Sequence, residues 1–131
     1  MMDDKTPPIM RTLLGGKIHR ARVTAAAMDY EGSITIDRAL LEAAGIGEFE
    51  RVQVVDLENG NRLETYVLPA PHRSGVIQVN GAAAHLIFQG DRIIIMSYVL
   101  VPEPLPAGYH PRVVLVDDSN QIREVRRAPV H

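Results

Sequence analysis

The stretch 51–68 reads RVQVVDLENGNRLETYVL and decides the fold class of this chain. Its two arms, 51–57 and 62–68, are rich in β-branched residues and partly alternate apolar with polar side chains, which is typical of strands. Asn59-Gly60 between the arms accepts the positive φ angles of a tight hairpin turn. We therefore predict an antiparallel β-hairpin over this stretch.

Further short strand patterns surround the hairpin. Residues 25–30 are expected to be irregular, Gly15-Gly16 to form a bulge or turn, and Pro69 and Pro71 to end the second arm of the hairpin. Two short helices are expected, one over 38–44 between an Asp37 cap and Gly45, the other at 80–85. Many short strands with two small helices predict a mainly β fold, a closed or nearly closed barrel. The additional strands are expected from residue 17 to about 24 and over 34–36, 76–79, 92–101, 113–116 and 122–125.

Composition limits the classes of protein that remain. The chain has 131 residues, of which 46% are hydrophobic and 5% aromatic, so one domain with an aliphatic core is expected over residues 1–131. A net charge of −2 argues against non-specific nucleic-acid binding. No apolar run reaches the roughly 20 residues that a bilayer requires, and the acidic start does not resemble a secretory signal. We therefore expect a cytoplasmic protein. The sequence contains no cysteine, so no disulfides are expected.

The dipeptide Gly32-Ser33 lies between a basic segment, 17–22, and the strand pattern that opens at Ile34. Glycine permits backbone angles that other residues avoid. If the turn brings the Ser33 hydroxyl against the Gly32 carbonyl, the peptide bond itself becomes a substrate for acyl transfer. An ordinary surface turn uses the same two residues, so the dipeptide alone does not decide between these interpretations.

A second group of candidates lies on the strand 62–68. Arg62, Glu64 and Tyr66 share one face of a regular strand, and Thr65 lies on the other. An arginine fork binds a carboxylate, and a tyrosine can supply a proton. An exposed strand face with an extended arginine is the alternative interpretation.

Two other patterns offer less specific evidence. The small residues of Asn80-Gly81-Ala82-Ala83-Ala84 would let a ligand or another backbone approach closely, although tight packing alone also explains them. His19, His72 and His85 match no ligand spacing of a metal site. No metal is therefore expected, and a metal-dependent enzyme is the weakest hypothesis.

Five segments, taken together, resemble bacterial aspartate 1-decarboxylase in order and spacing. They are Lys17-Ile18-His19-Arg20, Tyr30-Glu31-Gly32-Ser33, Asn59-Gly60, Arg62 with Thr65-Tyr66, and Asn80 to His85. The resemblance covers about residues 10 to 117. Residues 1–9 are polar and end in prolines, so we expect a flexible tail there, followed by a barrel over 10–117 and a C-terminal segment over 118–131.

The resemblance implies a double-psi β-barrel that forms a homotetramer with active sites at subunit boundaries. It also implies a proenzyme that cleaves itself between Gly32 and Ser33, leaving a pyruvoyl group derived from Ser33. That group would form a Schiff base with L-aspartate and release CO2 and β-alanine, for the synthesis of pantothenate and coenzyme A. Protein side chains lack such an electrophile, which is why a cofactor is needed.

The resemblance further implies roles for individual residues. Arg62 would bind a substrate carboxylate with help from the charge of Lys17, and Tyr66 would protonate the carbanionic carbon. Thr65 would polarise the Gly32 carbonyl during cleavage, as an oxyanion donor does. No step is assigned to His19 or Tyr30, although both match positions near the cleavage site. The remaining pocket residues would be Asn80, Gly81, Ala82 and Ala83.

Two points stay open at the level of sequence. The loop Pro71-His72-Arg73-Ser74 departs from the pattern common in the family, which leaves its conformation undetermined. A catalytically inactive small β-barrel binding module is the alternative to the decarboxylase, and an accessory maturation factor is compatible with the resemblance.

Overall fold

The computed structural model describes residues 6–127 and consists mainly of β-strands. Its one α-helix and one 3-10 helix are short. The elements are β1 Met10–Arg22, β2 Ala25–Ala27, β3 Ser33–Asp37, α1 Arg38–Ala44, β4 Arg51–Asp56, β5 Arg62–Ala70, β6 Ile77–Asn80, η1 Gly81–His85, β7 Arg92–Pro102, β8 Arg112–Val116 and β9 Ile122–Arg126.

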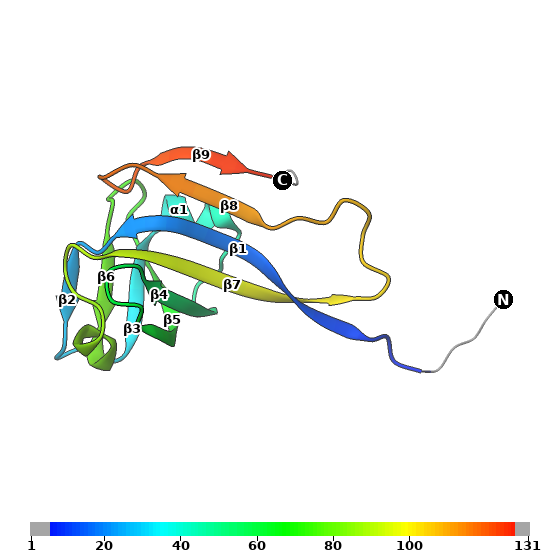
Figure 1. Ribbon diagram of the computed structural model, residues 1–131, viewed down its shortest axis with the longest axis horizontal. Helices are drawn as coiled ribbons and strands as arrows, with labels where there is room; N and C mark the ends of the chain where they lie inside the picture. The colour runs from blue at the N-terminus through cyan, green and yellow to red at the C-terminus, as the bar shows by residue number, and fades with distance from the viewer. Residues whose placement is uncertain (1–5, 128–131) are drawn as a thin grey trace.

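All nine strands are hydrogen-bonded in the order β2-β6-β3-β5-β4-β7-β1-β8-β9 (Figure 1). The pairs β1/β8, β2/β6 and β3/β5 are parallel, and the other neighbours are antiparallel. The predicted hairpin is present, with Val52 opposite Thr65 and Val55 opposite Arg62. The predicted fold class, a mainly β double-psi barrel with small helices, is confirmed.

The core is aliphatic, as the composition predicts, because alternate residues of neighbouring strands point into it. Ile18 of β1, Ile95 of β7 and Val54 of β4 lie next to one another across the sheet and are fully buried. Burying one such side chain contributes about 1.5–3 kcal/mol. None of the helices within residues 6–127 is long and apolar enough to cross a membrane.

Asp37 ends β3, begins α1 and holds the loop that follows β5. Its Oδ1 accepts hydrogen bonds from the Ala39 amide at 2.8 Å, as predicted for the helix cap, and from the Arg73 amide at 2.9 Å. Its Oδ2 accepts from the Gly75 amide at 2.9 Å. This buried carboxylate therefore fixes the loop 71–75, whose conformation the sequence did not determine. Gly45 ends α1 in the left-handed region, with φ of 72°.

Three expectations about secondary structure were wrong. Residues Ala25–Ala27 form a strand rather than an irregular segment, because parallel pairing with β6 satisfies their backbone. β1 begins at Met10 rather than near Lys17, because pairing with β7 extends the strand. Within this longer strand, the register shift after Leu14 confirms the bulge that was expected at Gly15-Gly16. β5 continues through Pro69, which a strand tolerates there because the pairing with β4 ends at Tyr66.

The first half of β1 and the second half of β7 extend beyond the barrel as a twisted two-stranded ribbon (Figure 1). Several apolar side chains on it are exposed, Leu100 at 66% and Met10 at 47%. Exposed apolar patches of this kind often mark protein interfaces.

Asp56, at the end of β4, introduces a pH-dependent contribution to stability. The side chain is fully buried; Oδ1 accepts a hydrogen bond from the Glu58 amide at 2.8 Å, and Oδ2 has no hydrogen-bond partner in the part of the chain that the structure describes. Burial, followed by the contact with the Asp91 carboxyl group, raises the pKa of Asp56 from 3.8 to about 6. Because the folded state binds this proton more tightly than the unfolded chain, the associated stability is present below pH 4 and is lost as the pH rises through 6.

We expect Asp56→Asn to increase the free energy of unfolding by about 1–3 kcal/mol at pH 8 and to give no gain at pH 4. The asparagine keeps the oxygen that binds the Glu58 amide and adds a permanent donor toward Asp91. Urea unfolding at the two pH values measures the effect, with the exposed Glu48→Gln as the control. Equal stability of Asp56→Asn and the parent protein at pH 8 would contradict the prediction.

Candidate active site

Ser33 is the first residue of β3 and lies opposite Asn80, the last residue of β6. Both side chains are buried, with Ser33 only 2% exposed. The Asn80 amide group donates to Ser33 Oγ at 2.9 Å and to Thr35 Oγ1 at 3.1 Å. Ser33 Oγ in turn donates to the Glu31 carbonyl at 3.3 Å. The predicted cleavage residue is therefore held in a defined polar environment rather than in an open loop.

Two residues of this network were missed by sequence analysis. Gln78 donates from Nε2 to Asn80 Oδ1 at 2.8 Å, which turns the amide nitrogen of Asn80 toward the two hydroxyl groups. Thr35 is the second hydroxyl. Strand alternation could have identified both, because Thr35 is two residues from Ser33 and Gln78 is two residues from Asn80 on the same strand faces.

Gly81 packs directly against the turn that contains Gly32. It has φ of +73°, and a Cβ added to it would lie 2.7 Å from the Gly32 amide nitrogen and 2.8 Å from the Tyr30 carbonyl oxygen. Any side chain here would collide with backbone. The close approach expected for the small residues of 80–84 thus occurs between two segments of this chain, at Gly81. Of the other two candidates in η1, Ala82 is exposed and Ala83 half-buried.

The register of β5 brings Thr65 and Tyr66 close to the same turn. Val67 lies opposite Ile34 in the parallel pair β3/β5. Extending that register backwards puts Tyr66 alongside Ser33 and Thr65 alongside Gly32. Tyr66 shares the outward face with Ser33, whereas Thr65 faces the core side opposite Val52.

Arg62 and Lys17 lie on the outer face of the barrel at a distance from Ser33: Arg62 is four residues before Tyr66 on β5, about 13 Å along the strand. Arg62 Nη1 donates to Gln53 Oε1 at 2.8 Å. Lys17 lies opposite Met96 of β7, and the strands β7, β4 and β5 separate β1 from β3. At about 4.8 Å per strand, Lys17 is roughly 19 Å along the sheet from the strand of Ser33. One chain therefore groups Gly32, Ser33, Asn80 and Gly81, but does not bring Lys17 or Arg62 to them.

Two further residues noted in the sequence have distinct environments. The Tyr30 side chain is 66% exposed beside the turn. Burial lowers the pKa of His19, and the positive charges of Lys17, Arg20 and Arg126 lower it further. Its Nδ1 is buried and has no hydrogen-bond partner within the described part of the chain. Among residues 6–127, no three histidine, cysteine or acidic side chains are grouped as metal ligands would be.

The contact between Gly81 and Gly32 can be tested by adding one methyl group. We expect Gly81→Ala to lower the free energy of unfolding by more than about 2 kcal/mol, because an alanine at positive φ costs about 1–2 kcal/mol before the collision is counted. The cleavage after Gly32 that the resemblance predicts should slow or stop, since the methyl group displaces the turn. Urea unfolding and intact mass measure the two effects.

Gly60→Ala is the matched control for this change. Gly60 has a nearly identical φ of +77°, but a Cβ there meets nothing within 4 Å. Gly60→Ala should lower the free energy of unfolding only by the cost of an alanine at positive φ and should leave cleavage unchanged. Equal behaviour of the two variants would refute a specific role of the Gly81 contact.

A family model described as aspartate decarboxylase matches residues 9–123. The chain belongs to the aspartate decarboxylase family. Similar proteins named aspartate 1-decarboxylase include one from Clostridium beijerinckii, 55% identical over 87% of this chain and 92% of the relative. One from Neisseria meningitidis is 54% identical over 89% of this chain and 92% of the relative. One from Carboxydothermus hydrogenoformans is 50% identical over 92% of this chain and 94% of the relative.

The match to the family spans every candidate residue, from Lys17 in β1 to Ala83 in η1. The resemblance predicted from five short segments is thereby confirmed. The C-terminal limit of the match, residue 123, extends into β9 and beyond the barrel boundary predicted at residue 117.

Proposed function

We propose that this protein is a cytoplasmic aspartate 1-decarboxylase that converts L-aspartate to β-alanine and CO2 for pantothenate and coenzyme A synthesis. It does so with a pyruvoyl group made from its own Ser33. The observation that carries the proposal is the buried Ser33 hydroxyl, which Asn80 binds at 2.9 Å at the end of a turn packed against Gly81. Membership of the family supplies the reaction class.

The residues around Ser33 fit such a group. A pyruvoyl group is small and carries two carbonyl oxygens, and the Asn80 amide already offers a donor at the position of Ser33 Oγ. Gln78 holds that amide in the donating orientation. When present, the group supplies the ketone electrophile that takes up the electrons released by loss of CO2.

Self-cleavage follows from the chemistry of the turn. Ser33 Oγ attacks the Gly32 carbonyl carbon while its proton passes to the departing Ser33 amide nitrogen, so an ester replaces the peptide bond. Thr65, alongside Gly32 by the β3/β5 register, polarises the carbonyl oxygen as the negative charge develops. Elimination then releases the Gly32 carboxylate, and hydrolysis with loss of ammonia leaves the ketone on the longer chain.

Binding of the substrate carboxylates requires positive charges, and within one chain Arg62 and Lys17 lie at a distance from Ser33. We propose a homotetramer in which the outer face of a second copy supplies Arg62 and Lys17 to the substrate carboxylates. Three strands separate Lys17 on β1 from Ser33 on β3, and Arg62 lies four residues before Tyr66 on β5, the strand next to β3. These separations and the exposed apolar ribbon of β1 and β7 support this arrangement. Tyr66, on the same face as Ser33, would protonate the substrate carbon after CO2 leaves.

Intact mass of the purified protein tests the proposal most directly. We expect a short chain ending at Gly32 and a long chain beginning at position 33, with the long chain lacking a free amine and reacting with hydrazine. The processed sample should release CO2 from L-aspartate. A requirement for an accessory maturation factor would appear as cleavage only after addition of cell extract. An uncut chain in both conditions would favour the inactive binding module.

A further inference from the structure

A group of arginines lies on the side of the barrel formed by β1, β7, β8 and β9, and none of them lines the Gly32-Ser33 turn. These residues line a cavity of about 350 Å³. This volume falls within the range of small-molecule sites. We call it the arginine cavity, defined by His19, Arg20, Arg92, Asp118 and Arg123.

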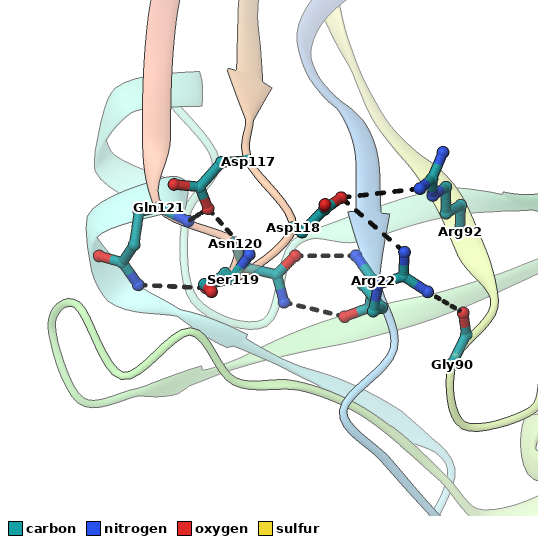
Figure 2. Close-up of polar contacts among 8 residues, drawn as sticks. All are labelled: Arg22, Gly90, Arg92, Asp117, Asp118, Ser119, Asn120 and Gln121. Atoms are coloured by element: carbon teal, nitrogen blue, oxygen red, sulfur yellow. Dashed lines mark hydrogen bonds and ion pairs between the residues drawn. The ribbon is translucent and has the colours of Figure 1, made fainter.

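Arg22 and Arg92 lie directly opposite each other in the antiparallel pair β1/β7. Like charges at such positions repel and destabilise a sheet. Both guanidinium groups lie near one carboxylate, Asp118, at 3.8 and 3.6 Å, as Figure 2 shows. These distances are longer than those of charge-assisted hydrogen bonds, and the Asp118 side chain is 88% exposed. Asp118 is therefore a loosely held anion that a better-fitting anion can displace.

The other acidic residue that lines the cavity, Asp117, uses one of its two carboxylate oxygens within the adjacent turn. Asp117 Oδ1 accepts the amides of Ser119 and Gln121, both at 2.9 Å, within the turn between β8 and β9 (Figure 2). Arg20 and Arg123 have no carboxylate partner among residues 6–127. The cavity thus has two arginines without counter-ions and a third with a weak one.

Arg20 reaches this position through an unusual backbone. It has φ of 64° at the bulge between Ile18 and Ala21, where the register of β1 and β7 shifts. A residue with a side chain in this region carries a conformational cost, and such residues cluster at functional sites. The adjacent His19 has a buried Nδ1 without a hydrogen-bond partner among residues 6–127. Burial lowers the pKa of His19, and the positive charges of Lys17, Arg20 and Arg126 lower it further.

We propose that the arginine cavity binds a small oxyanion carrying two or more negative charges, either a phosphate group or a dicarboxylate. Arginine forks match the oxygens of both groups. The bound anion would replace Asp118 next to Arg92 and would provide Arg20 and Arg123 with the counter-ion that they lack. Within one chain the cavity lies on β1, β7, β8 and β9 and Ser33 on β3, but His19 is two residues from Lys17 on β1. Dependence on Arg123, which has no part in the proposed decarboxylase site, therefore distinguishes binding in this cavity from binding at the substrate site.

Calorimetric titration of the processed, full-length protein tests the site, with sodium pyrophosphate and sodium succinate as probes at constant ionic strength. We expect saturable binding of at least one probe, and the stronger one identifies the ligand class. Arg123→Gln and Arg20→Gln should each weaken that affinity at least about tenfold. Asp118→Asn should tighten it severalfold because it removes the competing carboxylate.

Arg51→Gln is the matched control, since Arg51 is an exposed arginine on β4 outside the cavity, and it should bind like the parent protein. Circular dichroism verifies that the variants are folded. Binding at the substrate site would be insensitive to Arg123. Absence of saturable binding, or unchanged affinity in folded Arg20→Gln and Arg123→Gln, would overturn the proposal.

Discussion

Ser33→Ala should remain a single uncut chain and should show no decarboxylation of L-aspartate above background. The substitution removes the only oxygen that can attack the Gly32 carbonyl from within the same dipeptide, so neither the ester nor the ketone derived from it can form. Intact mass after prolonged warming measures cleavage, and CO2 release measures activity. Complete cleavage of this variant would exclude the mechanism.

The fold of Ser33→Ala should survive, which separates chemistry from unfolding. The variant loses the hydrogen bond from Asn80, worth about 1 kcal/mol, but Asn80 keeps Thr35 as a partner. Ser33→Cys is the conservative companion because it retains a nucleophile at the same atom. Partial cleavage in the cysteine variant and none in the alanine variant would assign the step to that side-chain atom.

Arg62→Ala should be cleaved normally and yet lose turnover. Arg62 is exposed and, among residues 6–127, is hydrogen-bonded through its side chain only to Gln53, so its removal leaves the Gly32-Ser33 turn intact. Loss of a charged hydrogen-bonding partner of a substrate carboxylate costs about 2–5 kcal/mol, which corresponds to a decrease in kcat/KM of roughly 30- to 5,000-fold. Steady-state kinetics on fully processed protein measures the decrease.

Arg51→Ala provides the comparison for Arg62→Ala. Arg51 is also an exposed arginine and lies on the neighbouring strand of the same hairpin, where it forms an ion pair with Glu64 at 3.4 Å. Arg51→Ala removes the same charge from the same sheet as Arg62→Ala, so a general electrostatic effect on kcat/KM would appear in both variants. Wild-type kinetics of Arg62→Ala would remove Arg62 from the substrate site.

Local patterns predicted much of the fold correctly because they depend on neighbouring residues. The Asn59-Gly60 hairpin, the Asp37 cap and the Gly45 helix end are interactions within a few residues, and all three are present. Ala25–Ala27 and Pro69 were misjudged because their strand pairing involves partners distant in the chain. Patterns of neighbouring residues do not show which distant strand will pair with a segment such as Ala25–Ala27.

The candidate site was likewise predicted in part from the sequence and in part revealed only by the structure. The order and spacing of short motifs by themselves identified the family and the candidates from Lys17 to Ala83, because the residues required for one chemistry occur in a fixed order along the chain. Only the tertiary structure paired Ser33 with Asn80, revealed Thr35 and Gln78 beside them, and packed Gly81 against Gly32. These contacts arise where β3 and β6 pair, and pairing of distant strands is decided by the burial of the whole core rather than by any one segment.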